Sequence, residues 1–124
     1  MEFKFDTKPS YTVITPQTDA LDVNLTGQLA EQIALYINKG SNNFIIDMQQ
    51  CSKTDNTSFP ALAELHEDCY MNQRSLVFTG IQAPVLDALN ENELAEMLNI
   101  APTMQEAVDI ISMEILERDL MNED

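Results

Sequence analysis

Two short segments of this sequence are apolar on both faces of an extended chain, and they constrain the fold more than any other feature. They are Phe44–Ile46 and Leu76–Phe78. Runs of this kind are typical of central strands in a parallel sheet, which helices cover on both sides. Between them lies a predicted helix, marked by Pro60 in its first turn and by apolar residues at helical spacing: Leu62, Leu65 and Cys69. A strand, a helix and a strand within about 35 residues predict a right-handed βαβ unit.

The rest of the chain supplies the other elements. Before the first buried strand, the pattern predicts a hairpin of strands Phe3–Phe5 and Tyr11–Thr15 around the turn Lys8–Ser10, then a loop Gln17–Asn24 and a helix Leu25–Lys39. A loop, Cys51–Thr57, precedes the second helix. After the second buried strand, the pattern predicts a helical stretch Pro84–Leu98 that Asn90 and Asn92 can interrupt, a short edge strand Ile100–Ala101, and a last helix from the capping box Thr103–Glu106 to about Leu120. The predicted fold class is α/β, a mixed four- to five-stranded sheet with about four helices packed on it. At 124 residues we expect a single domain, 1–124, with an ordered core of about residues 3–118 and a frayed tail at 121–124.

The charge balance argues against two classes of partner. The chain holds 6 Lys and Arg against 21 Asp and Glu, for a formal net charge of -15. A surface this negative repels phosphate backbones and anionic lipids, so we expect neither nucleic acid nor a membrane as partner. The longest apolar run, Ile33–Ile37, is too short to span a bilayer, and the N-terminus lacks the apolar stretch of a signal peptide. Cys51 and Cys69 form no Cys-x-x-Cys pair, so we expect a cytoplasmic protein with both thiols reduced and unpaired.

The titratable side chains offer little for catalysis. His66 and Cys69 share a face of the predicted second helix, but a zinc site needs three or four protein ligands and no second His/Cys cluster follows. No G-x-S-x-G motif accompanies His66, and the three glycines build no phosphate-binding loop. We predict no catalytic residue, no metal and no cofactor, and therefore no enzyme; the alternative is a small enzyme that uses carboxylates and His66.

The C-terminal third has two features that could face a partner. Residues 87–124 hold eleven carboxylates against Arg118, which indicates either a solvated helical surface or a docking face for a basic partner. The last helix also has two apolar stripes. One is expected to pack on the sheet: Met104, Ala107, Val108, Ile111 and Ile115. The other lies on roughly the opposite side, and we expect a partner or a second copy, in a homodimer, to cover part of it: Ile110, Met113, Leu116 and Leu120.

The segment Thr54–Pro60 is the most informative part of the chain. It joins a buried strand to the start of a helix, and it places the hydroxyls of Thr57 and Ser58 at the positive end of the helix dipole. One interpretation is helix capping, because Ser, Thr, Asp and Asn are the residues that helix starts prefer. The other is a phosphorylation site, because a phosphate on Thr57 would gain from the dipole and from nearby backbone N–H groups.

The order of segments along the chain resembles the STAS domain of anti-sigma-factor antagonists. The segments that carry the likeness are Leu21–Asp22, Asn43–Met48, Asp55–Phe59, Ser75–Gly80 and Ala101–Ala107. The family pattern at the central helix is Asp-Ser-(Ser/Thr)-Gly-Leu. Here Asp55 matches the aspartate, Asn56 replaces the first serine, Thr57 falls on the phosphorylatable hydroxyl, Ser58 stands where the family usually has glycine, and Phe59 takes the apolar position. Asp22 falls on an acidic position near the phosphorylation site.

The resemblance implies a binding module in bacterial signalling and transcription regulation. Such a domain would bind an anti-sigma factor with a serine/threonine-kinase fold and so free a sigma factor, and phosphorylation would release the partner. Thr57 is the implied phosphorylation site, with Ser58 as the alternative. The implied contact residues are Asp22, Asp55, Asn56, Thr57, Ser58 and Phe59. The competing hypothesis is a degenerate STAS scaffold that serves interaction or oligomerisation without phosphorylation.

Overall fold

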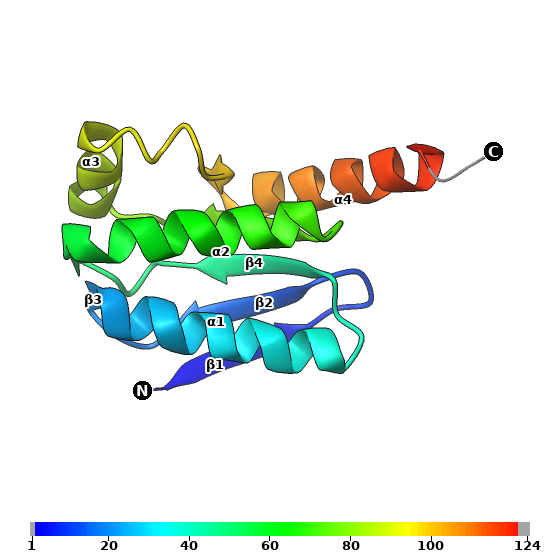
Figure 1. The fold of residues 1–124 in the computed structure, drawn as a ribbon, viewed down its shortest axis with the longest axis horizontal. Coiled ribbons are helices and arrows are strands. Elements are labelled where there is room, and N and C mark those ends of the chain that lie inside the picture. The colour runs from blue at the N-terminus through cyan, green and yellow to red at the C-terminus, as the bar shows by residue number, and fades with distance from the viewer. Residues whose placement is uncertain (1, 122–124) are drawn as a thin grey trace.

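The computed structural model describes residues 2–121. Its elements, in chain order, are β1 (Phe3–Thr7), β2 (Thr12–Pro16), β3 (Ala20–Leu21), α1 (Val23–Asn38), β4 (Asn43–Asp47), β5 (Lys53–Thr54), the single 3-10 turn η1 (Asn56–Ser58), α2 (Phe59–Met71), β6 (Ser75–Thr79), α3 (Ala83–Glu91), β7 (Ile100–Ala101) and α4 (Met104–Met121) (Figure 1). Met121, expected to belong to a frayed tail, is the last residue of α4, and residues 122–124 of that predicted tail lie outside the described part of the chain.

The main sheet has five strands in the order β1-β2-β4-β6-β7. β1 runs antiparallel to β2, and the other pairs are parallel. This confirms the predicted mixed sheet with four helices. The predicted hairpin, both buried central strands and the βαβ connection from β4 through α2 to β6 are confirmed with it.

The two central strands alternate between two separate cores. Phe44 and Ile46 of β4 belong to the larger core, which α1, α2 and α3 cover, whereas Ile45 belongs to a smaller core under α4. Each of these three side chains is 0% exposed. Successive residues of a strand point to opposite faces, so a strand covered on both sides needs an unbroken apolar run.

A second sheet of only two strands, β3 and β5, was not predicted. Leu21 pairs in parallel with Thr54, and both segments had been expected to be loops. Strands of only two residues are too short to show an alternating pattern, and their pairing joins segments far apart in the chain, so the sequence does not reveal it. The helix next to this sheet also begins earlier than predicted, at Val23, because Asp22 is its N-cap and accepts from the Leu25 N–H at 2.8 Å.

The helical stretch predicted over Pro84–Leu98 is interrupted at Asn92, one of the two asparagines expected to allow this. α3 stops at Glu91 with Asn92 as its C-cap, and Glu93 follows with a φ of 60°. A non-glycine residue in the left-handed region cannot continue a right-handed helix. Leu94 and Leu98 are nevertheless buried, in the turn that leads to β7. The apolar spacing therefore predicted the burial of Leu94 and Leu98 correctly, although these residues do not belong to a continuous helix.

α4 packs on the sheet through a narrower stripe than predicted. Ala107 and Ile111 are fully buried, and Val108 and Ile115 pack beside them. Two assignments were wrong: Met104 is 37% exposed, and Ile110, expected on the outer side, packs against the inner core. The helix begins as predicted, since the Thr103 hydroxyl accepts from the Glu106 N–H at 3.1 Å. Within residues 2–121, no helix has the length and apolar character needed to cross a membrane.

Candidate functional site

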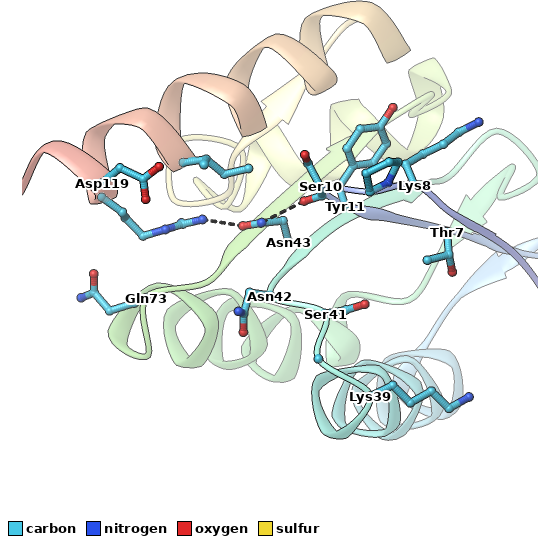
Figure 2. Close-up of a pocket in the computed structure, with 14 residues that line it drawn as sticks. Thr7, Lys8, Ser10, Tyr11, Lys39, Ser41, Asn42, Asn43, Gln73 and Asp119 are labelled. Carbon is cyan, nitrogen blue, oxygen red and sulfur yellow. Dashed lines mark hydrogen bonds between the residues drawn. The ribbon is translucent and has the colours of Figure 1, made fainter. Parts of the chain in front are cut away.

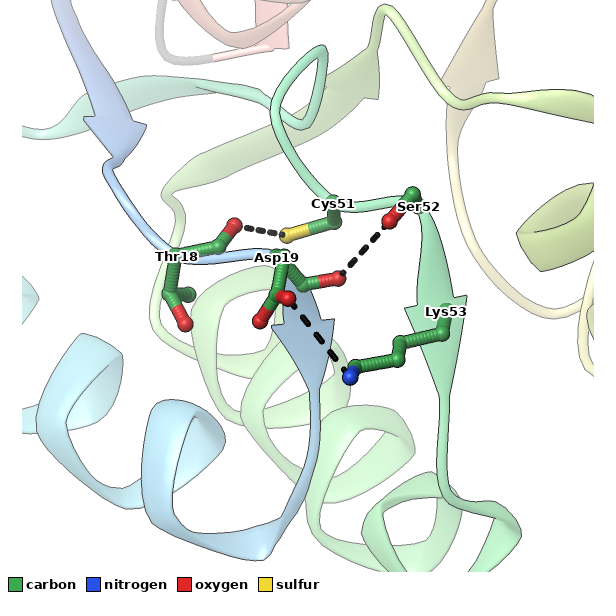
Figure 3. A network of polar contacts seen from close by, with 5 residues as sticks. All are labelled: Thr18, Asp19, Cys51, Ser52 and Lys53. Atoms are coloured by element: carbon green, nitrogen blue, oxygen red, sulfur yellow. Dashed lines mark hydrogen bonds and ion pairs between the residues drawn. The ribbon is translucent and has the colours of Figure 1, made fainter.

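The loop that carries Thr57 is held at the carboxyl-terminal end of β4 by the small sheet. After β4, the chain forms β5, which lies beside β3. At the start of this pairing the Asp19 carbonyl accepts from the N–H groups of Ser52 and Lys53, at 2.9 and 3.1 Å. Figure 3 shows this region, with the Cys51 thiol directed at the Thr18 carbonyl and Lys53 reaching the Asp19 carboxylate at 3.5 Å. Next along the chain, the Leu21 carbonyl accepts from the Thr54 hydroxyl and from the Asp55 N–H, at 3.0 and 2.9 Å. These bonds place Asp22 and Asp55, 33 positions apart, at the same end of the molecule.

Asp55 organises the turn that follows. It is the N-cap of η1, and its carboxylate accepts from the Thr57 N–H at 3.0 Å. That backbone hydrogen bond, together with one from the Thr57 side chain, lowers the pKa of Asp55 below its usual value. The Asp55 carboxylate is therefore ionised near neutral pH and lies directly beside the Thr57 hydroxyl.

The two hydroxyls expected at the helix start have opposite surroundings. Thr57 is exposed, whereas Ser58 is 0% exposed and its hydroxyl donates to the Asp55 carbonyl at 2.8 Å. Ser58 is the N-cap of α2 by position, but its side chain makes no capping bond to that helix. The capping interpretation is therefore correct for Asp55, not for Thr57 or Ser58.

The remaining expected contact residues divide in the same way. Asn56 is exposed beside Thr57, whereas Phe59 is 5% exposed and belongs to the larger core. Asp22 is half-buried, and its carboxylate is engaged in capping α1. The surface that another molecule could meet at this turn therefore consists of Asp55, Asn56 and Thr57.

His66 takes part in a polar network between α2 and α4. Its Nε2 atom accepts from the Asn99 backbone N–H at 3.2 Å. The Tyr70 hydroxyl donates to Glu114 at 2.8 Å, and the Asn99 side-chain amide donates to Tyr70 and to Glu114, both at 2.9 Å. Among residues 2–121, no three His, Cys, Asp or Glu side chains are grouped so that they could hold a metal ion. The structure gives His66 a packing and hydrogen-bonding role.

We expect this network to make the protein's stability sensitive to mild acid. Burial lowers the pKa of His66 below 6.5, and Glu114 opposes this only in part. As pH falls through 6.5 the unfolded chain takes up the His66 proton before the folded chain does, so the folded state loses stability. We expect the melting temperature to fall between about pH 7.5 and pH 6, and to fall less in His66→Gln, which keeps a hydrogen-bond acceptor but does not titrate. Thermal unfolding followed by circular dichroism at both pH values measures this, and an equal fall in the two proteins would contradict it.

Both cysteines are buried free thiols. Cys51 is 1% and Cys69 3% exposed, and burial raises the pKa of each thiol to about 11. A thiol with so high a pKa is almost fully protonated near neutral pH and is a poor nucleophile. Neither side chain is suited to covalent catalysis.

Part of this site has no signal in the sequence. Asp19 and Leu21 offer backbone carbonyls, which any residue has, so no residue type marks them. The resemblance to the STAS domain placed Asp22 near the phosphorylation site, but did not identify it as a helix cap. Only the pairing of β3 with β5 shows how the two acidic residues come together.

Comparison with known proteins agrees with this geometry. Residues 3–107 match the family model of the STAS domain. The fold is similar to that of the protein TM1081 of Thermotoga maritima (TM-score 0.76, 14% identity, 90% of each chain). It is also similar to the unphosphorylated form of the anti-sigma factor antagonist SpoIIAA of Bacillus (TM-score 0.68, 16% identity, 90% of this chain and 96% of that one), a protein whose phosphorylated form is known as well.

A third similar structure is the murine Solute Carrier 26 family member A9 anion transporter (TM-score 0.67, 16% identity), where the match covers 84% of this chain but 18% of the transporter. At these identities the likeness establishes the fold alone. A search of curated protein sequences returns no match. Because the family model covers most of its length, the chain belongs to the STAS domain family.

Proposed function

We propose that this STAS domain is an anti-sigma-factor antagonist, a binding module that captures an anti-sigma factor with a serine/threonine-kinase fold and is released by phosphorylation of Thr57. The observation that supports this most is the contrast at the turn after β5. Thr57 is exposed, and the neighbouring hydroxyl of Ser58 is buried and already hydrogen-bonded. A kinase can reach the first hydroxyl without unfolding the turn. We therefore propose Thr57, and not Ser58, as the site.

The proposed switch has a simple electrostatic basis. The partner kinase would transfer the γ-phosphoryl group of ATP to the Thr57 hydroxyl, whose proton passes to a base on the kinase as ADP leaves. The phosphoryl group adds about 1.5 to 2 negative charges at neutral pH. The phosphoryl group would lie beside the Asp55 carboxylate, on a protein whose formal net charge is already -15. In a contact surface this charge is repelled and costly to desolvate, so the complex would dissociate.

The module needs no catalytic chemistry of its own. We propose that it is not an enzyme and that it acts in the bacterial cytoplasm, where sigma factors and their regulators work. The exposed residues Asp55, Asn56 and Thr57 form the centre of the proposed contact surface, and Asp22, the N-cap of α1, follows the Leu21 carbonyl that accepts from the Asp55 N–H.

A scaffold without phosphorylation is the second candidate. Asn56 and Ser58 depart from the family pattern at the positions that flank Thr57. A similar fold also forms part of a murine anion transporter, so the fold is not restricted to one kind of protein. Incubation with a cognate kinase and ATP, followed by mass spectrometry of the peptide around residue 57, separates the two. Phosphate on Thr57 supports the switch, and an unmodified peptide with partner binding intact supports the scaffold.

We also propose that the outer stripe of α4 is a contact between two copies of this chain. Met113, Leu116 and Leu120 are 61%, 59% and 58% exposed. We expect a dimer in sedimentation equilibrium, stronger at high salt because salt screens the like charges of the two copies. The double substitution Leu116→Ser with Leu120→Ser is expected to give monomers, whereas Leu35→Ser on α1, where Leu35 is 52% exposed, leaves the dimer intact. A monomeric wild-type chain at all salt concentrations would contradict this proposal.

A further inference from the structure

A polar pocket of about 500 Å³ lies at the pole opposite the Thr57 loop. It is formed where α1 and α2 end, where β4 begins, and where the last turns of α4 pass over them (Figure 2). Its charged lining residues are Lys8, Lys39 and Arg118 against one carboxylate, Asp119. The chain has only six Lys and Arg residues against 21 acidic ones, and three of these six line this pocket.

Arg118 is held at this pocket by neutral groups. Its guanidinium donates to the Ser75 hydroxyl at 2.9 Å and to the Asn43 side-chain oxygen at 2.5 Å. Asn43 is oriented in turn because its amide nitrogen donates to the Ser10 carbonyl at 2.9 Å (Figure 2). The ion pairs of residues 2–121 join Lys8 to Asp6 and Lys53 to Asp19, and neither involves Arg118. A positive charge is therefore fixed in place, and no carboxylate of residues 2–121 lies within 4 Å of it.

Helix ends do not explain this arrangement. Cations near helix C-termini commonly compensate for free carbonyls. Here the last carbonyls of α1, those of Tyr36 and Ile37, accept from the N–H groups of the turn that follows, and α2 ends in the same way. Arg118 is directed instead at the side chains of Asn43 and Ser75, which begin β4 and β6. A guanidinium has five N–H donors, and its hydrogen bonds within residues 2–121 use two of them.

The rest of the lining suits a hydroxylated molecule. Ser41, Asn42 and Gln73 bring a hydroxyl and two amide groups to the wall near the ends of α1 and α2 (Figure 2). Lys8 and Lys39 line the pocket on the side away from Asp119 and add positive potential there (Figure 2). Lys8 is paired with Asp6 at 3.4 Å, and the Lys39 ammonium lies over the Tyr36 ring, 4.8 Å from its centroid, which leaves Arg118 as the principal charge.

We propose that this pocket binds a small hydroxylated organic anion, with a phosphate or carboxylate group on Arg118 and hydroxyl groups on Ser41, Asn42 and Gln73. The planar fork of arginine matches the oxygens of either acidic group. The pocket volume lies within the range of small-molecule sites. This site lies away from the Thr57 loop, so the proposal does not depend on the proposed switch.

The test is a titration of the ¹⁵N-labelled protein, followed by nuclear magnetic resonance, with glucose 6-phosphate, citrate and uncharged glucose as probes. We expect saturable shifts of the Asn42, Asn43 and Gln73 side-chain amides with one of the two anions and not with glucose. The phosphate and the hydroxycarboxylate arms identify the acidic group. Shifts with glucose as large as those with the anions would overturn the role of Arg118.

Two pairs of variants separate binding from folding. Asn42→Asp places a carboxylate of the same shape in the pocket at an exposed position, and we expect it to weaken anion binding about fivefold. Asn24→Asp makes the same change in the first turn of α1, about 20 Å from its other end, and should bind as the wild type does. Arg118→Gln should abolish the shifts, whereas Lys53→Gln, a cation outside the pocket, should not. Equal binding by Asn42→Asp and Asn24→Asp, or no saturable shift in the wild type, would overturn the proposal.

Discussion

Thr57→Glu is expected to weaken binding of the kinase-fold partner by about 1–3 kcal/mol or more, whereas Thr57→Ala is expected to bind as the wild type does. The glutamate would put a negative charge beside the Asp55 carboxylate, in the exposed centre of the proposed contact surface. Alanine removes an exposed side chain and its hydrogen bond to the Asp55 carboxylate, and the loss of one solvent-exposed hydrogen bond costs about 1 kcal/mol of stability or less. The backbone N–H of residue 57, which donates to the Asp55 carboxylate, is present in both variants.

Titration calorimetry of each variant against the partner measures the effect. Thr57→Gln is the matched control, since it has the size of glutamate without the charge and should bind nearly as well as alanine. Melting curves establish that all three variants fold. Equal affinity of Thr57→Ala and Thr57→Glu for the partner would contradict the switch hypothesis and would favour the scaffold without phosphorylation. A loss shared by Thr57→Gln and Thr57→Glu would mean that bulk, not charge, disturbs the surface.

Ser58→Glu is expected to destabilise the fold by about 3–5 kcal/mol, although it lies one residue from Thr57. Ser58 is 0% exposed, and its hydroxyl donates to the Asp55 carbonyl. A carboxylate there would be buried without a partner cation and would face a carbonyl oxygen, an arrangement with a large desolvation cost. Ser58→Ala loses one hydrogen bond and is expected to cost about 1 kcal/mol.

Urea unfolding of Ser58→Glu, Ser58→Ala and Thr57→Glu gives these free energies directly. Thr57→Glu should stay close to the wild type, so the two glutamate variants should differ by several kcal/mol. Ser58→Gly restores the residue usual in the family and should not reduce partner binding. If Ser58→Glu were as stable as Thr57→Glu, the Ser58 side chain would be accessible and Ser58 would return as a candidate phosphorylation site.

Much of the fold follows from local sequence patterns. The apolar runs at Phe44–Ile46 and Leu76–Phe78 predicted central strands because a strand covered on both faces has no polar alternation. Gly40 after α1 and Thr103 before α4 marked helix ends through backbone freedom and capping, which are local effects. The likeness of Asp55–Phe59 to the family pattern placed the candidate site in the turn between β5 and α2.

Tertiary contacts decided what local patterns left open. α3 ends at Glu91 although apolar residues continue to Leu98, because the left-handed Glu93 turns the chain while Leu94 and Leu98 still reach the core. Ile110 packs inward and Met104 does not, because the sheet beneath α4 determines how much of the helix is covered.

The sequence alone determined the fold class, the family likeness and the turn in which Thr57 lies, because strand burial, helix ends and turn residues are encoded in short stretches of chain. Only the tertiary structure decided which hydroxyl of that turn faces outward. Thr57 and Ser58 are adjacent and chemically alike, and the pairing of β3 with β5 together with the packing of Phe59 orients one to solvent and the other to the interior. The same holds for the pocket around Arg118, which joins residues 75 positions apart in the chain. Such contacts depend on how distant elements meet, and no stretch of sequence encodes them by itself.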